Sequence, residues 1–335
     1  MRHSHLILLF SLVLLADPTG YYLAGKYTIG GPAAWDYINI DPAARRLYVT
    51  HLTQIEVLDA DTGHKMGAIM GLSGVHGIAL VPELGKGFAS NGETDTVSVI
   101  DLKTLQHVAE IKAGKKPDAI VYDPGTKQVI VSNGESENIT VIDAASAKVT
   151  GTITIGSGPE YIVSDGKGTI WVNLEDKDAY VTVDLNGKEL KKTTPLAGCK
   201  GPSAMAIDRA TRRLFIGCAN NTGLVVEADS GGIVSKVAIG AHVDAATFDT
   251  AAGLAFFSTG DGKITVVKET SPGRYAVTDT IATKRGAKTM VLDNKTKKIF
   301  LPTAEGVPTT ATGPPKPSGP GAYKAGEFVV LVVSK

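Results

Sequence analysis

Residues 40–67, IDPAARRLYVTHLTQIEVLDADTGHKMG, alternate short runs of apolar and β-branched residues with turns. The order is strand, turn, strand, short loop, strand and turn, as expected of antiparallel strands. The same order returns at 80–109, LVPELGKGFASNGETDTVSVIDLKTLQHVA, and at 122–150, YDPGTKQVIVSNGESENITVIDAASAKVT. Pairs such as VSVI and ITVI, with Gly or Asn-Gly between the strands, favour β units over helical repeats. The chain therefore repeats one all-β unit.

The spacing of the units predicts the fold. Each unit has an anchor position at the turn after its first strand: Asp41, Val81, Asp123, Asp165, Asp208, Asp249 and Asp293. Neighbouring anchors lie 40 to 44 residues apart, which is the period of a four-stranded propeller blade. The last unit stops after its third strand, and residues 21–29 resemble the missing fourth. We expect an all-β, seven-bladed β-propeller of antiparallel blades, closed by this N-terminal strand, in one domain over 17–335.

Composition and the N-terminus limit the classes of function. The 335 residues include 34 Lys and Arg and 34 Asp and Glu, so no overall charge attracts nucleic acid or an anionic membrane. Arg2, the apolar run 6–15 and the small residue Ala16 have the proportions of a secretory signal, residues 1–16. No later segment is long enough to span a membrane. Export to the periplasm or the extracellular space is predicted.

Polar residues recur where one face of the ring is expected. Five positions before each anchor, at the start of the strand that lines the channel, stand Asp36, His76, Asp118, Glu160, Ser203, Asp244 and Lys288. At the end of the second strand stand His51, Asn91, Asn133, Asn173, Cys218, Thr259 and Thr303, followed closely by Glu175 and Glu305. These residues predict a binding site for a ligand at the channel face. The alternative interpretation is a polar lining for a water-filled mouth.

No cofactor is predicted, although these side chains are compatible with a divalent metal. Asp36, His51 and His76 come from the first two blades and are the candidate ligands. The Asp residues that end the third strands, such as Asp59 and Asp101, are better interpreted as turn formers than as metal ligands.

Three further features carry predictions. Cys199 and Cys218 belong to the same blade and are expected to form a disulfide in an exported protein. The Pro- and Gly-rich segment 306–326 is expected to be an inserted loop on the face of the polar rings, as a lid, a partner-binding loop or a tolerated insertion. Trp35 and Tyr37 are expected to pack between blades, with stacking on a ligand as the alternative.

The repeats DPAARRLYVT, SNGETDTVSVIDLKT and SNGESENITVIDAASAKV resemble those of the YVTN-repeat, or YncE-like, β-propellers, which are exported bacterial proteins. The resemblance extends over 21–335 and implies the fold and export, but no activity. Because no recognised catalytic motif is present, the leading hypothesis is a non-enzymatic binding or scaffold protein for a small ligand, a peptide or a protein. The alternative is a metal-dependent, lactonase-like hydrolase with its metal in the channel, and a third reading is an accessory to redox chemistry.

Overall fold

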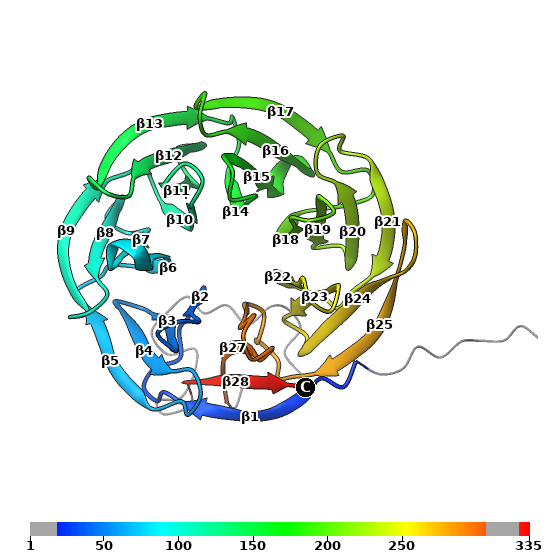
Figure 1. The fold of residues 1–335 in the computed structure, drawn as a ribbon, viewed down its shortest axis with the longest axis horizontal. Coiled ribbons are helices and arrows are strands. Elements are labelled where there is room, and N and C mark those ends of the chain that lie inside the picture. The colour runs from blue at the N-terminus through cyan, green and yellow to red at the C-terminus, as the bar shows by residue number, and fades with distance from the viewer. Residues whose placement is uncertain (1–18, 306–327) are drawn as a thin grey trace, which may run out of the picture.

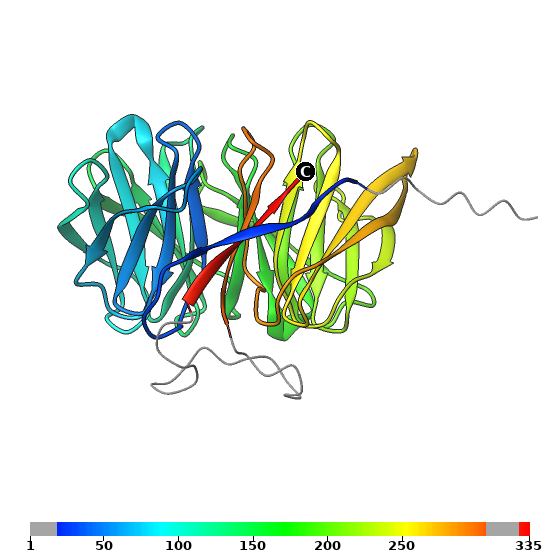
Figure 2. The same ribbon diagram turned by 90° about the horizontal axis from the view of Figure 1, so that it is seen from below.

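The computed structural model of the protein describes residues 19–305 and 328–335. Within these residues, seven four-stranded antiparallel sheets form a closed ring around a central channel (Figure 1). Seen edge-on, the strands run between the two faces of the ring (Figure 2). The predicted seven-bladed propeller is therefore confirmed. The predicted signal segment 1–16 and the inserted loop 306–326 lie outside the described residues.

Each of the first six blades runs from the channel outward in chain order. The first three blades are β2 (Ile38–Asp41), β3 (Arg46–His51), β4 (Gln54–Asp59) and β5 (Lys65–Met70); β6 (Val75–Val81), β7 (Lys86–Asn91), β8 (Thr96–Asp101) and β9 (Gln106–Lys112); β10 (Pro117–Asp123), β11 (Gln128–Asn133), β12 (Asn138–Asp143) and β13 (Lys148–Thr154). The next three are β14 (Pro159–Ser164), β15 (Thr169–Leu174), β16 (Ala179–Asp184) and β17 (Glu189–Pro195); β18 (Pro202–Asp208), β19 (Arg213–Cys218), β20 (Thr222–Glu227) and β21 (Ile233–Ala238); β22 (Val243–Asp249), β23 (Leu254–Thr259), β24 (Lys263–Ser271) and β25 (Arg274–Ala282). Two short 3₁₀ helices, η1 (Pro82–Leu84) and η2 (Glu175–Lys177), interrupt the loops.

The seventh blade joins the two ends of the described chain. Its order is β1 (Tyr22–Thr28), β28 (Phe328–Ser334), β27 (Ile299–Ala304) and β26 (Val291–Leu292). Strand β1 pairs antiparallel with β28 from Tyr22 opposite Ser334 to Thr28 opposite Val329, as Figure 1 shows at the outer edge of the ring. The N-terminal strand therefore completes the last blade, as predicted, and protects an edge that would otherwise be unpaired.

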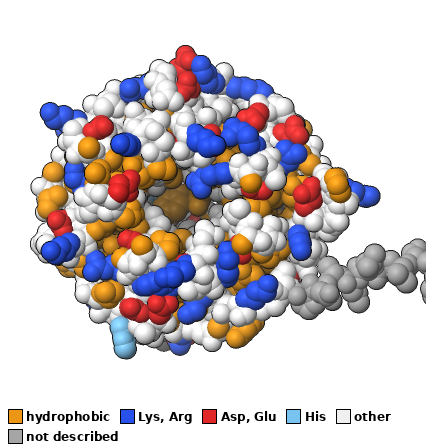
Figure 3. Space-filling view, in the orientation of Figure 1, with side chains coloured by type: hydrophobic (Ala, Val, Ile, Leu, Met, Phe, Trp, Pro, Cys, Tyr) orange, Lys and Arg blue, Asp and Glu red, His pale blue; other side chains and the backbone are white. Residues whose placement is uncertain are grey.

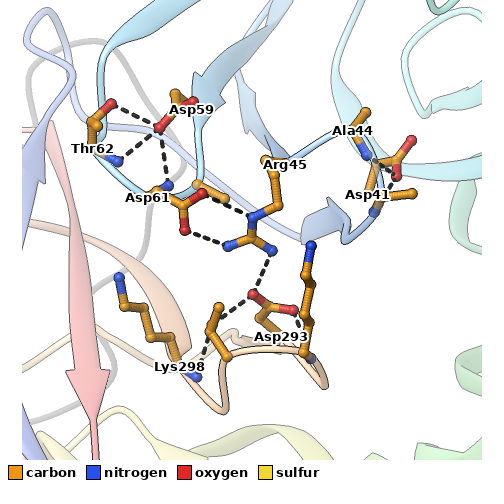
Figure 4. Close-up of polar contacts among 12 residues, drawn as sticks. Asp41, Ala44, Arg45, Asp59, Asp61, Thr62, Asp293 and Lys298 are labelled. Atoms are coloured by element: carbon orange, nitrogen blue, oxygen red, sulfur yellow. Dashed lines mark hydrogen bonds and ion pairs between the residues drawn. The ribbon is translucent and has the colours of Figure 1, made fainter.

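The turns are built by aspartates, as the sequence indicates. Asp41 Oδ1 accepts the backbone N–H groups of Ala43 and Ala44, each at 2.9 Å. Asp59 Oδ1 does the same for Asp61 at 3.0 Å and Thr62 at 2.8 Å (Figure 4). These are the bonds by which Asx side chains stabilise tight turns. The turn-former interpretation is confirmed for Asp59, and Asp41 has the same role after the first strand of its blade.

Some anchor aspartates have a second role that the sequence analysis missed. Arg45 occupies the left-handed turn position of blade one, with φ of 57°, and its Nη1 lies 2.6 Å from Oδ2 of Asp293 in blade seven (Figure 4). The same turn position holds Arg212 and Lys297, which pair with the preceding blade's Asp165 at 3.4 Å and Asp249 at 2.7 Å. We call these three ion pairs the blade clasps, because each joins two adjacent blades.

The apolar cores lie between neighbouring blades. At the junction of blades seven and one, Leu47 and Val49 pack with Phe300 and Val330, and all four are fully buried. Trp35 stacks on Phe328 there, with 5.7 Å between the ring centroids, so its predicted packing between blades is confirmed. Burying side chains of this size stabilises the fold by roughly 2 kcal/mol each. The blades are therefore held by apolar contact inside and by the clasps at one face.

The predicted disulfide is present between Cys199 and Cys218, whose Cα atoms lie 5.4 Å apart. It links the loop before β18 to the end of β19 in the fifth blade. Both cysteines are buried, at 1% and 0% exposure, so the disulfide is shielded from solvent.

We expect the double change Cys199→Ala and Cys218→Ala to lower the free energy of unfolding by about 3 kcal/mol, the loop-entropy value for a bridge of this span. Urea denaturation with and without dithiothreitol measures the effect. The reductant should destabilise the wild type and leave the double variant unchanged. Equal stability of both proteins under oxidising conditions would contradict the prediction.

The acidic mouth of the central channel

One face of the ring carries the first residues of the channel-lining strands. Each of these residues follows a loop that returns from the outer strand of the previous blade, so topology alone directs them toward the axis. Six of the seven predicted positions interact with one another across the mouth: Asp36, His76, Asp118, Glu160, Asp244 and Lys288. The seventh, Ser203, is buried and donates its Oγ hydrogen to the carbonyl of Val243 at 2.7 Å. We call the six interacting residues, without Ser203, the acidic mouth.

His76 is the centre of one cluster in the mouth. Its Nδ1 lies 2.6 Å from Asp36 Oδ2 and 3.6 Å from Asp118 Oδ1. One donor atom from each of the three side chains falls within 4.8 Å of the others. Gly92 lies against the opposite edge of the imidazole, where a Cβ atom would be 2.5 Å from Nε2. The Asn-Gly turn of the sequence thus leaves the space that positions His76.

The charges in this cluster shift the proton affinities. Burial lowers the pKa of His76, but the hydrogen bond to Asp36 and the charges of Asp118 and Asp36 outweigh it and raise this pKa to about 9. Burial and the carboxylate of Asp36 raise the pKa of Asp118 to about 7, against the opposing effect of His76. Oδ1 of Asp118 is shielded from solvent and has no hydrogen-bond partner in the described part of the chain. The cluster is therefore short of positive charge.

The other half of the mouth has the same deficit. Lys288 Nζ pairs with Asp244 Oδ2 at 2.6 Å. Glu160 forms no ion pair with a described residue, and burial together with the carboxylates of Asp118 and Asp244 raises its pKa well above the usual value. Among the described residues, four carboxyl groups thus share two paired basic side chains, His76 and Lys288, with Lys116 as a more distant third cation near Asp118.

A cavity of about 530 Å³ opens beside the cluster. Its wall holds six acidic residues and one basic residue: Asp118, Glu135, Glu137, Glu160, Glu175, Asp176 and Lys116. Glu175 was predicted as part of the site, and Glu135, Glu137, Asp176 and Lys116 were missed. The signal for Glu135 was in the sequence, since it follows Asn133 by two positions as Glu175 follows Asn173.

The second predicted ring lies inside the blades. His51 uses both ring nitrogens there, with Nε2 2.6 Å from the carbonyl of Pro32 and Nδ1 3.3 Å from Glu56. Asn91 donates to Ser98 at 2.8 Å and Asn133 to Thr140 at 2.9 Å, both within one blade. These three residues are buried. The predicted set of metal ligands was Asp36, His51 and His76. The side chains that come together among the described residues are Asp36, His76 and Asp118, so Asp118 takes the place of His51.

The remaining predicted positions are also held by local bonds. Asn173 Nδ2 donates to the carbonyl of Ala204 at 3.1 Å. Thr259 Oγ1 donates to Asp261, and Thr303 Oγ1 to the carbonyl of Arg285. Cys218 is in the disulfide. Glu305 pairs with Lys26 at 2.6 Å and Lys284 at 2.7 Å, which lowers its pKa to about 2.

Tyr37 packs against the apolar core between blades three and four, in agreement with the prediction, and it also borders the channel. Its ring contacts that of Tyr161 from blade four edge-on, with 5.8 Å between centroids. Burial and the carboxylates of Asp118, Glu160 and Asp36 raise its pKa well above the usual value. Tyr37 and Tyr161 therefore lie just beneath the acidic mouth, inside the channel.

The ring and its acidic mouth define a seven-bladed β-propeller with a polar channel face. Residues 47–167 match the model of the YncE-like beta-propeller family, which confirms the resemblance drawn from the repeats. No curated protein sequence matches the chain. Among the described residues, no helix has the length and apolar character needed to cross a membrane.

Two solved structures share the fold at low sequence identity. Kuenenia stuttgartiensis hydrazine synthase matches with a TM-score of 0.73 and 15% identity, over 84% of this chain and 96% of that one. U3-55K matches with a TM-score of 0.76 and 8% identity, over 93% of this chain and 99% of that one. At these identities the likeness concerns the fold alone.

Proposed function

We propose that the protein is an exported, non-enzymatic binding propeller that takes a positively charged ligand at the acidic mouth. The observation that carries this proposal is the concentration of carboxyl groups around one opening, with six acids against one lysine in the adjoining cavity. Bringing like charges into a desolvated site is unfavourable unless a cation relieves them. The disulfide and the YncE-like match support export.

The cluster of Asp36, His76 and Asp118 is the best position for a divalent metal. One imidazole and two carboxylates are a donor set that Zn²⁺ and Mn²⁺ accept. The solvent-shielded Oδ1 of Asp118, which lacks a hydrogen-bond partner among the described residues, fits such an ion. A bound metal would supply a fixed positive charge at the head of the acidic cavity, and the neighbouring Glu160 and Glu175 would then orient a ligand in that cavity.

The test begins with elemental analysis of the mature protein as purified, followed by calorimetric titration of chelator-treated protein with Zn²⁺ and with Mn²⁺ at pH 8. We expect one ion per chain and loss of binding in His76→Ala. His64→Ala, which alters an exposed histidine in a turn, serves as the matched control. Absence of binding, or equal binding in His76→Ala, would remove the metal from the proposal. Titration with spermidine then tests the cavity for an organic cation, and failure there as well would overturn the proposed function.

The affinity for the metal should depend on pH, because the ion and the proton compete for His76. The pKa of His76 is about 9, so the imidazole is protonated at neutral pH. We expect the affinity to rise at least about tenfold per pH unit between pH 6 and pH 8, and more steeply below pH 7, where Asp118 must also release a proton. Repeating the calorimetry at three pH values checks this, and a flat profile would show that His76 is not a ligand.

A metal-dependent hydrolase, lactonase-like, is the second candidate. The observation in its favour is that Glu160, a carboxyl group with a raised pKa, lies beside the candidate donors, as general acids and bases often do. Turnover of lactones or of p-nitrophenyl esters by the metal-loaded protein, lost in Glu160→Gln with metal binding retained, would establish it. No turnover would leave the binding function as proposed.

A further inference from the structure

The channel beyond Tyr37 and Tyr161 is a chamber lined mostly by apolar residues, although polar atoms expose the larger share of the surface in its outer part. Its inner part has a volume of about 200 Å³ and its outer part about 460 Å³. The two parts share wall residues from blades one, three, four and six, including Ile120, Ile162 and Ala246, and so form one space. All seven blades contribute to the outer wall, as for example Pro42, Leu80 and Phe248.

This chamber opens on the ring face that carries the turns after the first strands, since Pro42, Pro82 and Arg209 from those turns line its outer part. Figure 3 shows a hollow at the centre of the ring, with apolar side chains in and around it and Lys or Arg side chains nearby. Its volume is that of pockets which bury small organic ligands, and such pockets combine an apolar wall with few polar groups. The chamber and the acidic mouth therefore differ in both position and chemistry.

One cationic side chain stands at the outer edge of this chamber. Arg209 donates from Nε to the carbonyl of Ser164, at 3.0 Å, which holds the guanidinium at the rim. Within the described chain Arg209 makes no ion pair with a carboxylate, unlike Arg45 and Arg212. The acidic residue of the outer wall, Asp41, is buried, and its Oδ1 is occupied by two backbone N–H groups.

We propose that the chamber binds a small, mainly apolar carboxylate. Its hydrocarbon or aromatic body would displace water from the apolar side chains of the wall, which include Leu80, Ile162 and Phe248. Its carboxylate would receive hydrogen bonds from Nη1 and Nη2 of Arg209, the geometry in which guanidinium groups bind carboxylates. This site is independent of the cation proposed at the acidic mouth.

The test uses decanoate and decan-1-ol, which share a chain and differ in charge, in calorimetric titrations of the full mature protein. We expect decanoate to bind once per chain and about tenfold more tightly than decan-1-ol, as a charge-assisted hydrogen bond implies. Arg209→Gln should remove that preference and leave decan-1-ol unchanged. Arg213→Gln, in which the arginine lost pairs with Glu227 at 3.3 Å, is the matched control.

A second variant tests the location. Ala246 borders both parts of the chamber and is 5% exposed, so Ala246→Phe should fill the space and abolish binding of both probes. If that variant does not fold, Thr247→Phe alters a partly exposed wall residue instead. The proposal is overturned if decanoate does not bind or if it binds no better than decan-1-ol. It is also overturned if a folded wall-filling variant binds decanoate as tightly as the wild type does.

Discussion

The Arg45→Met variant is expected to lose about 4 kcal/mol of unfolding free energy at pH 7, the size of effect seen when one partner of a buried ion pair is removed. Asp293 is the partner left behind, and its side chain is fully buried. Methionine keeps most of the apolar stem of Arg45 but supplies no hydrogen-bond donor. The clasp also joins the first blade to the last, so its loss weakens the closure of the ring.

Urea denaturation measures this effect, and Lys127→Met is the matched control. Lys127 occupies the same left-handed turn position, with φ of 57°, but the preceding blade has Val81 where a clasp needs aspartate. The control should change stability by less than about 0.5 kcal/mol, as surface substitutions do. Equal losses in Lys127→Met and Arg45→Met would show that the turn, and not the ion pair, is responsible.

The same clasp predicts a dependence on pH. Burial raises the pKa of Asp293, but hydrogen bonds from Thr296, Arg45 and the backbone of Lys295 outweigh it and hold the pKa below its ordinary value. A carboxyl group with a lowered pKa stabilises the folded state above its unfolded pKa, and this contribution is lost as the pH falls through the folded value. The difference between wild type and Arg45→Met should therefore shrink as the pH falls from about 5 toward 2.

The Asp118→Asn variant is expected to gain stability and to lose affinity for the cation that we propose at the acidic mouth. Without added metal, the unfolding free energy at pH 8 should rise by about 1–2 kcal/mol, since a carboxylate held against Asp36 is removed. Metal affinity should fall at least about 1000-fold, or about 4 kcal/mol, because one of three donors loses its charge. A gain in stability with a loss of binding marks a site built for a ligand.

The direction of this stability change, a gain at high pH, follows from the raised pKa of Asp118. A group with a raised folded pKa contributes stability below its unfolded pKa and loses that contribution as the pH rises through the folded value, about 7 here. The advantage of Asp118→Asn should accordingly grow between pH 5 and pH 8. Thermal unfolding in chelator at both pH values measures it, and Asp101→Asn, which alters an exposed turn, is the control. A less stable Asp118→Asn at pH 8 would contradict the interpretation of the mouth as electrostatically strained.

The two predicted rings of polar residues show which parts of the site can be predicted from the sequence. The ring that begins with Asp36 and His76 follows from topology, because the first strand of every blade lines the axis. The ring of Asn91 and Asn133 does not, because the second strand lies one position further out and its amides bond to the third strand of the same blade. Position along the repeat is periodic, whereas the direction of a side chain depends on its neighbours across the strand.

The sequence analysis did not predict the blade clasps, for a related reason. The cation at the turn and the aspartate it meets belong to different repeats, so neither unit shows the pair when read alone. Arg45 and Asp293 are the extreme case, since they come from the first and the last unit. The pattern becomes visible only when each turn is compared with the anchor of the unit before it.

The pairing of β1 with β28 makes the completeness of the chain a condition of its stability. Leu23 and Val333 are adjacent in the sheet yet about 310 positions apart, 333 minus 23, and closing so long a loop costs roughly 5 kcal/mol of chain entropy. Formation of the six blades between them reduces this entropy cost, because the folded ring already holds the two strands close together. A chain that stops before β28 would leave β1 without its neighbour and β27 with an open edge. Ring closure thus makes the stability of the whole ring depend on two strands from opposite ends of the described chain.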